Sequence, residues 1–306
     1  MTLALIAGEG ALPGLVYDAC KTPPYVAALQ GFPPKRIPHN ATFRIEQLGS
    51  FIAELKARGV TEVCFAGAVR RPPLDPSAVD AATMPLVPRM MQALQEGDDA
   101  ALRTVLSFFE EAGLTVRAAH ELRPDLLLSS GVPTKSQPDD QARTDADRAA
   151  HIVAAMGAAD IGQACIVAKG QVLGIETVMG TDWMVNMVAF FRATNLHTLM
   201  ANTTLRFLPG GEAQAKKISK NTGIPLADAM GFPEDLNRGG ILYKAPKPAQ
   251  DMRIDVPTIG VDSIRAAAAA GLDGIVIVAG GVMVIDRDAT LAEADQLGLF
   301  LWVQEP

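Results

Sequence analysis

Short apolar runs alternate with helix-like stretches over the first 130 residues, and this alternation constrains the fold more than any other feature of the chain. Residues 44–59 carry apolar side chains at helical spacing and end at a glycine, and residues 97–113 form a second such stretch. Because strands separated by helices need crossover connections, the pattern predicts a parallel, doubly wound α/β sheet. Three runs read as its buried strands: LALIA at 3–7, YVAAL at 25–29 and VCFAGAV at 63–69.

The length of 306 residues allows two domains, since single hydrophobic cores usually stop growing at roughly 250 to 300 residues. Residues 129–143, SSGVPTKSQPDDQAR, are poor in apolar side chains and rich in Ser, Pro and Gly. Such a composition is typical of a boundary between domains. We therefore predict an N-terminal Rossmann-like domain at 1–130, a linker at 131–143 and a C-terminal mixed α/β domain at 144–306.

The second half begins with a helical pattern from about Thr144 to Met156. Two strand-like runs flank Lys169-Gly170 and predict a β-hairpin. Thr181 precedes another apolar run and is placed to cap a helix. Between about 192 and 240, glycines and prolines interrupt the pattern, so this part reads as an extra segment of unassigned role.

The charge and cysteine content narrow the class of protein. A formal net charge of -7, with no run of Lys or Arg, argues against a nucleic-acid partner. The three cysteines are far apart and odd in number, which favours buried thiols over disulfides or a metal site. No apolar run reaches the ~20 residues of a spanning helix, and the start lacks the features of a signal peptide. We therefore expect a cytoplasmic protein.

The stretch KAPKPAQDMRIDVPTIGV, residues 244–261, alternates charged and apolar side chains. Side chains two apart on a strand share a face, so Asp251, Arg253 and Asp255 should converge while the residues between them pack inward. Two interpretations remain open at this point: a solvated strand edge or a functional site.

Gly8 and Gly10, in LIAGEGALPG, follow the first strand, as in a phosphate-binding loop. The dinucleotide fingerprint fails, because Pro13 stands at the third glycine and Gln30 where an acid is expected. A plain strand-to-helix turn and a different nucleotide-contacting loop are the alternatives, and NAD binding is disfavoured. No GxSxG elbow, GxxxxGK[ST] loop or HExxH spacing is present.

Arg70 and Arg71 come just after the strand that ends near Gly67, at the edge where open α/β sheets bind ligands. The arginine fork suits phosphate oxygens, although a surface pair is the alternative. Glu176 and Asp182 offer, with the two aspartates above, the hard oxygen ligands that Mg²⁺ prefers. Each of these acids alone is equally typical of a helix cap or a solvated side chain.

Seven strings, taken in order from residue 3 to about 302, resemble the LpxI-type UDP-2,3-diacylglucosamine diphosphatases of lipid A biosynthesis. They are LIAGEGALP, CFAGAVRRP, GDDAALRTVLSFFEEAG, AAHEL, DIGQACIVAKGQVLGIET, GTDWM and KAPKPAQDMRIDVPTIGV. The resemblance is interrupted at about 192–240, where typical members are shorter. Met179 also stands where the family commonly has an acid.

The resemblance implies a two-domain hydrolase that binds its substrate in a cleft between a Rossmann-like domain and a C-terminal catalytic domain. Such a pyrophosphatase attacks the sugar-side phosphorus of UDP-2,3-diacylglucosamine with water. It releases UMP and 2,3-diacylglucosamine 1-phosphate (lipid X), and it requires Mg²⁺ or another divalent cation. Asp255 matches the aspartate of the family string R-x-D-x-P-T-I-G.

From the resemblance and the residue chemistry together we assign three hypothetical sets of site residues. The catalytic set is Asp255, as metal ligand or general base, with Asp251, Arg253 and Lys247. The metal set is Asp255 and Glu176. The substrate-binding set is Gly8, Gly10, Gly67, Arg70, Thr181 and Asp182.

A substrate with two acyl chains lies in a bilayer, so we expect peripheral contact with the inner face of the inner membrane. An apolar groove near Met84, Met90, Met91 or Trp183 is a candidate for the acyl chains, although such residues are more often core. A homodimer is the candidate assembly. The alternative function is a non-catalytic nucleotide- or lipid-binding protein on the same fold, since fold alone does not establish catalysis.

Overall fold

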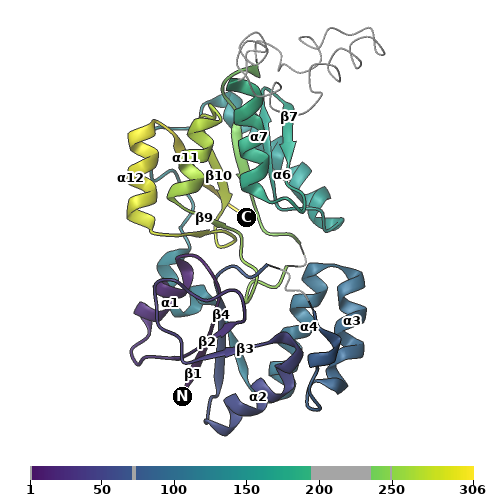
Figure 1. Cartoon of the computed structure of the whole chain (residues 1–306). Helices are drawn as coiled ribbons and strands as arrows, with labels where there is room; N and C mark the ends of the chain where they lie inside the picture. The colour runs from purple at the N-terminus through teal and green to yellow at the C-terminus, as the bar shows by residue number, and fades with distance from the viewer. Residues whose placement is uncertain (1, 71–73, 194–235, 249) are drawn as a thin grey trace, which may run out of the picture. The chain divides into compact units, whose positions relative to one another are not determined.

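The computed structural model describes residues 2–70, 74–193, 236–248 and 250–306, and it divides into two compact units (Figure 1). Unit 1 comprises Met1–Leu128, Ala249–Thr258 and Met283–Ile285. Unit 2 comprises Ser129–Pro248, Ile259–Val282 and Asp286–Pro306. Arg71 and most of the extra segment expected at about 192–240 lie outside the described residues.

Unit 1 is built on a five-stranded sheet in the order β3-β2-β1-β4-β5, in which every pair of neighbours is parallel. Its strands are β1 (Leu3–Ala7), β2 (Tyr25–Leu29), β3 (Ala41–Phe43), β4 (Glu62–Ala66) and β5 (Thr115–Arg117). Its helices are α1 (Leu12–Ala19), α2 (Leu48–Ala57), α3 (Val87–Glu96), α4 (Asp98–Glu111) and α5 (Ala119–Leu122). The order is that of the first five strands of a Rossmann sheet, so the predicted parallel, doubly wound architecture is confirmed.

Successive side chains of β1 point to opposite faces of this sheet and pack into two hydrophobic cores, one on each face. Ala4 and Ile6 pack with α2 and α4, whereas Leu5 and Ala7 pack with Val16 of α1 on the other face. The helix expected at 44–59 begins with a 3-10 turn, and its α-helical part buries four apolar residues spaced three or four apart. They are Leu48, Phe51, Ile52 and Leu55.

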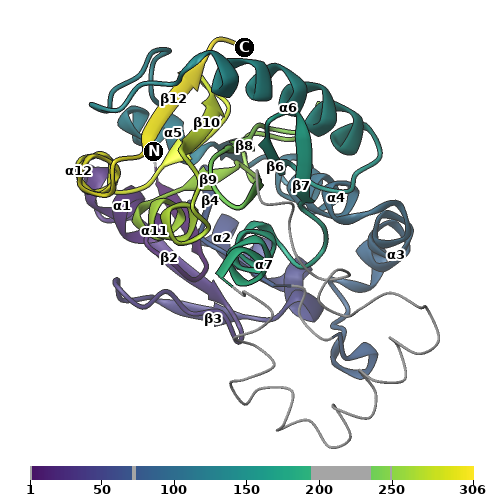
Figure 2. The same cartoon turned by 90° about the horizontal axis from the view of Figure 1, so that it is seen from above.

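Unit 2 is built on a mixed sheet in the order β12-β10-β8-β6-β7, and all five strands are labelled in Figure 2. The first three strands are parallel, and the hairpin β6–β7 adds two antiparallel pairings, which confirms the mixed α/β expectation. The strands are β6 (Ala164–Ala168), β7 (Gln171–Ile175), β8 (Ile241–Lys244), β10 (Gly274–Val278) and β12 (Phe300–Gln304). Two short strands, β9 (Thr258–Ile259) and β11 (Met283–Val284), lie where the chain passes between the units.

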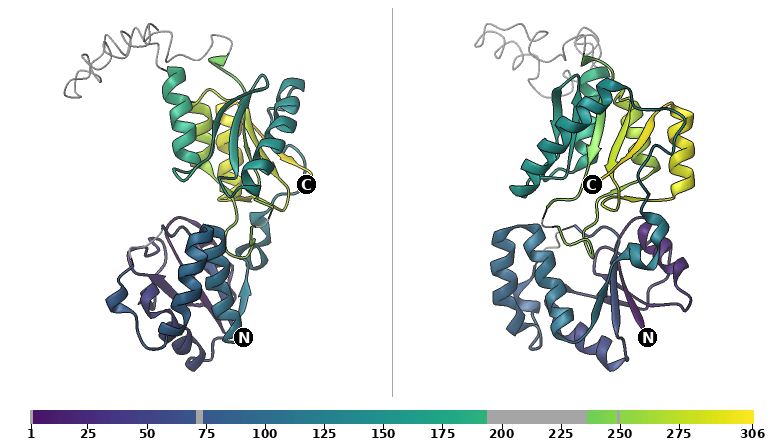
Figure 3. Two further views of the ribbon diagram at one scale, coloured as in Figure 1. Left: turned by 90° about the vertical axis from the view of Figure 1, so that its right-hand side faces the viewer. Right: turned by 180° about the vertical axis from the view of Figure 1, so that it is seen from behind.

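Helices cover both faces of the unit 2 sheet, with α6 on one face and α7 on the other (Figure 3). These helices are α6 (Asp140–Ala158), α7 (Thr181–Ala193), α11 (Val261–Ala269) and α12 (Arg287–Leu297). The helix expected from Thr144 begins earlier, because the Asp139 carboxylate accepts the backbone N–H of Ala142 at 2.7 Å and caps it.

The β6–β7 hairpin turns at Lys169 and Gly170, as predicted, and both residues have positive φ (49° and 75°). The buried Asp145 of α6 accepts the backbone N–H groups of both residues, at 2.9 and 2.7 Å. One carboxylate therefore fixes α6 to the turn.

The polar segment at 131–143 is hydrogen-bonded to unit 2 before α6 begins. Gly131 bridges Val303, and the Thr134 hydroxyl accepts the Leu301 N–H at 2.9 Å. Ser136 donates to the Gly298 carbonyl at 2.9 Å. The segment predicted as a linker thus carries side chains that hydrogen-bond to the backbone of and beside β12.

Candidate functional sites

The charged stretch that begins at Asp251 forms a turn, so the predicted strand is wrong. The N–H groups of Ile254 and Asp255 both donate to the Asp251 carbonyl, at 3.2 and 3.1 Å. The Asp251 carboxylate also accepts the Arg253 N–H at 3.0 Å, a local bond that competes with strand pairing. The expected inward packing holds nonetheless, since Ile254 and Val256 pack against the two cores of unit 1.

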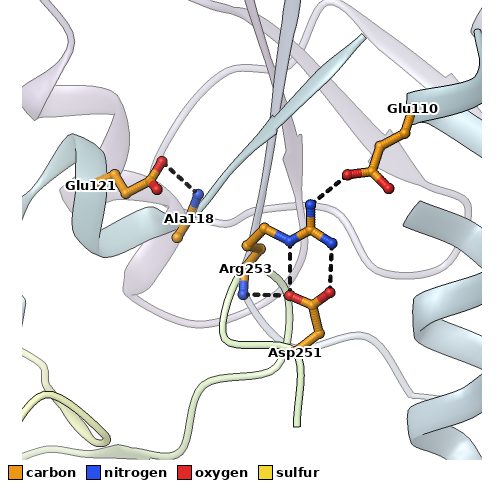
Figure 4. Close-up of polar contacts among 5 residues, drawn as sticks. All are labelled: Glu110, Ala118, Glu121, Asp251 and Arg253. Atoms are coloured by element: carbon orange, nitrogen blue, oxygen red, sulfur yellow. Dashed lines mark hydrogen bonds and ion pairs between the residues drawn. The ribbon is translucent and has the colours of Figure 1, made fainter. Parts of the chain in front are cut away.

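Arg253 forms an ion-pair cluster with two carboxylates of unit 1 (Figure 4). Its Nε and Nη2 atoms donate to the two Asp251 oxygens at 2.9 and 2.7 Å, and its Nη1 pairs with Glu110 of α4. The bonds to Asp251 raise the pKa of Arg253, and Arg253 in turn lowers the pKa of Asp251. This cluster holds the turn to α4. Figure 4 also shows Glu121 of α5, which accepts the backbone N–H of Ala118 just before that helix.

The Asp255 carboxylate is oriented by a neighbour that the sequence patterns did not single out. Gln250 Nε2 donates to Asp255 Oδ2 at 2.6 Å, and the Gln250 side chain is buried. Glu110 was also missed, because no short-range pattern reveals a partner 143 residues away in the sequence. Three of the four predicted catalytic residues, Asp251, Arg253 and Asp255, therefore lie in one turn of unit 1.

The glycines after β1 and β4 meet at the carboxyl edge of the unit 1 sheet, beside the point where the strand order reverses. Glu9 and Ala68 exchange both backbone hydrogen bonds, each at 2.9 Å. A Cβ on Gly8 would lie 2.6 Å from the Ala68 oxygen, and one on Gly67 would lie 2.7 Å from the Glu9 oxygen. Close loop packing therefore explains both glycines without a ligand.

The other two predicted substrate contacts at this edge, Gly10 and Arg70, are exposed. Gly10 has a φ of +95° and open space where a Cβ would stand. The structure thus brings Gly8, Gly10 and Gly67 together in two adjoining loops, with Arg70 two residues beyond the paired Ala68.

Unit 2 contains a buried polar network at the carboxyl end of β8. Glu176 accepts the Thr181 hydroxyl at 2.5 Å and the Gln163 N–H at 2.9 Å. Lys244, the last residue of β8, donates to the Thr181 hydroxyl oxygen at 3.0 Å. Glu176 and Lys244 are each 8% exposed. Two predicted residues, Glu176 and Thr181, thus meet around Lys244, which sequence reasoning missed.

The remaining predicted residues of unit 2 lie on the surface or in an ion pair. Asp182 is exposed in the first turn of α7, where a carboxylate is stabilised by the helix dipole. Lys247 Nζ forms an ion pair with Asp160 at 2.7 Å. Lys247 belongs to unit 2, whereas the other three predicted catalytic residues belong to unit 1.

Among the described residues, no group of three or more His, Cys, Asp or Glu side chains is gathered for a metal ion. Both Glu176 oxygens accept hydrogen bonds, so this residue would have to exchange them for metal bonds. Mg²⁺ often needs only one or two carboxylates, with waters and substrate phosphates completing its shell, and the half-buried Asp255 fits that simpler role.

The cysteines carry no disulfide, and burial raises the pKa of Cys64 and of Cys165 to about 12, as expected for buried thiols. Cys20 is partly exposed. Within the part of the chain that the structure covers, no helix is both long and apolar enough to span a membrane.

Comparison with known proteins covers nearly the whole chain. The model of the LpxI N-terminal domain matches residues 2–126, and that of the LpxI C-terminal domain matches residues 129–206 and 213–302. The chain is also similar to the UDP-2,3-diacylglucosamine pyrophosphatase LpxI of Caulobacter vibrioides. The two are 36% identical over 309 residues, which span 99% of this chain and 98% of that protein.

Proposed function

This chain belongs to the LpxI family, and from that premise we propose that it hydrolyses the pyrophosphate bond of UDP-2,3-diacylglucosamine in lipid A synthesis. The observation that carries the proposal is the identity of 36% with a named pyrophosphatase over 99% of the chain. The family expected from the sequence strings is thereby confirmed. The products would be UMP and 2,3-diacylglucosamine 1-phosphate.

In the proposed reaction, water attacks the sugar-side phosphorus and the bond from that phosphorus to the bridging oxygen breaks, so that UMP leaves. Asp255 accepts the proton of the attacking water, as a general base in hydrogen-bond reach of it would. The bond from Gln250 to Asp255 Oδ2 supports this role, because it holds the carboxylate in one orientation. In the alternative role of Asp255 as a metal ligand, with Glu176 as a second candidate ligand, Mg²⁺ would neutralise phosphate charge and lower the pKa of its water.

The predicted cations receive different parts in this proposal. Lys247 forms an ion pair with Asp160, and we propose that its ammonium group also contacts a phosphate oxygen of the substrate. Arg253 is engaged by Asp251 and Glu110, which favours a part in holding the turn that carries Asp255. For the substrate-binding set we propose that Gly10, Arg70 and Asp182 contact the substrate, because all three are exposed.

The test is release of UMP from UDP-2,3-diacylglucosamine, with Mg²⁺ or with chelator, by the native chain and by Asp255→Ala. We expect metal-dependent release that falls by at least about 100-fold in the variant, within the range that general-base catalysis contributes. Asp262→Ala, at an exposed aspartate of α11, is the control that should keep full activity. A folded native chain that releases no UMP would favour the non-catalytic binding protein instead.

Peripheral contact with the inner membrane is the second part of the proposal, and exposed apolar side chains of unit 2 support it. Gln163 donates its N–H to Glu176, so the loop before β6 and the loop after β7 touch. Large exposed apolar residues stand in these two loops and in the first turn of α7: Ile161, Val178, Met179 and Trp183. Val178 is 96% exposed and Met179 is 58% exposed. Such a group can insert among lipid acyl chains.

Cosedimentation with phospholipid vesicles tests this contact. Met179→Ser should weaken binding, whereas Met84→Ser should not, because Met84 lies in unit 1 with a similar exposure of 57%. If Met84→Ser alone weakens binding, the acyl chains are met by the methionines of unit 1, where Met91 is also exposed. Met90 packs against the core of that unit. The homodimer remains a prediction that light scattering of the purified chain would check.

A further inference from the structure

Gln250 has a buried side chain, with 9% of its surface exposed, although its amide is strongly polar. Burial of an amide is costly unless its groups find hydrogen-bond partners. Its Nε2 donates to Asp255 Oδ2 at 2.6 Å, at the short end of the range for such bonds. The buried amide is therefore held against Asp255, the residue on which the proposed function depends.

The surroundings fix the backbone of Asp255 independently of Gln250. The Asp255 N–H donates to the Asp251 carbonyl at 3.1 Å, and the side chains of Ile254 and Val256 are packed in unit 1. Arg253 holds the same turn to Glu110 of α4. With the backbone held, rotation about the side-chain bonds of Asp255 is the freedom that the Gln250 bond restricts.

We propose that Gln250 is a positioning residue for Asp255, and that its amide holds the carboxylate in the orientation that hydrolysis requires. This inference rests on the proposed function. In this role Gln250 acts on the reaction through Asp255. Misorientation of a catalytic group lowers kcat more than it weakens substrate binding, because the correct geometry is needed when the reacting atoms meet.

The experiment measures kcat and KM for UMP release by the native chain and by Gln250→Met, which keeps the length of the side chain and removes its donor. We expect kcat to fall by about 10- to 100-fold with KM unchanged. Gln250→Glu should cost more, because it places a second carboxylate against Asp255. Gln92→Met is the matched control, since Gln92 donates to the exposed carboxylate of Glu96 at 3.0 Å, and it should keep native kinetics.

Two measurements without turnover separate positioning from structural damage. Hydrogen exchange of residues 250–258 should be native-like in Gln250→Met, and so should the affinity for UMP measured by calorimetry in chelator. An unchanged kcat, a raised KM at native kcat, or lost exchange protection of the turn would each overturn the inference. A native chain that releases no UMP would instead refute the proposed function, and the inference would fall with it.

Discussion

Replacing Asp145 by Ala tests the tie between α6 and the β6–β7 hairpin. The carboxylate is 1% exposed and accepts the backbone N–H groups of Lys169 and Gly170 together with Gln141 Nε2 at 3.1 Å. A hydrogen bond to a charged group contributes about 1.5 to 3 kcal/mol. Two such bonds, less the cost of burying the carboxylate, give an expected loss of about 2 to 4 kcal/mol.

Urea unfolding followed by tryptophan fluorescence is the assay. The chain has two tryptophans, Trp183 and Trp302, and both belong to unit 2, so the signal follows the unit that the substitution affects. With a slope of about 2 kcal/mol per molar urea, the midpoint of Asp145→Ala should fall by about 1 to 2 M. The midpoint of Asp145→Asn should fall by less, because one acceptor oxygen remains.

The control is Asp147→Ala, an exposed aspartate on the same helix, which should stay within about 0.5 kcal/mol of the native chain. If Asp145→Ala unfolds at the same urea concentration as Asp147→Ala, the two backbone bonds add nothing to stability. The reasoning from burial and bond geometry would then be refuted.

Three further predictions concern other features of unit 1. Gly8→Ala should lower stability by about 1 to 3 kcal/mol through the clash with the Ala68 carbonyl, whereas Gly14→Ala in α1 meets nothing closer than 3.7 Å and should be neutral or stabilising in thermal unfolding. Arg253→Met should speed hydrogen exchange of residues 250–258 while the exchange of β1 stays native. Exchange of residues 250–258 at the native rate in the variant would count against the tie to Glu110. The bond from Arg44 lowers the pKa of Glu46 to about 2 from 4.5, so its stabilisation is complete above pH 4.5 and fades as the pH falls toward 2. Exchange rates of α2 in native and Glu46→Gln chains should therefore differ at pH 6 and converge at low pH.

Strands β1, β2 and β4 and the β6–β7 hairpin were predictable because local patterns encode them, whereas the short strands β3, β5 and β8 were not singled out from the sequence. The period of α2 is visible in its sequence, and the β6–β7 turn is marked by Lys169-Gly170. The turn at Asp251 was mistaken for a strand because alternating charged and apolar residues are also compatible with a turn in which the Asp side chain accepts the backbone N–H two residues later.

The partners within the candidate sites were less predictable. Gln250 and Glu110 matter through contacts that the fold creates, with residues 5 and 143 positions away. Lys244 was only the first residue of the charged stretch and received no role, and its bond to Thr181 spans 63 positions. Composition and spacing identify residue types that suit a chemistry, but the pairing of such residues depends on the tertiary structure.

The return of residues 250–258 to unit 1 has a consequence for biosynthesis. Proteins commonly fold their N-terminal domains first as the chain leaves the ribosome. Here Ile254, Val256 and Met283 belong to the cores of unit 1, so that unit stays incomplete until nearly the whole chain has been translated. A nascent chain that ends at Leu128 would expose apolar surface that these residues cover, and it would depend on chaperones for longer than its place in the sequence suggests.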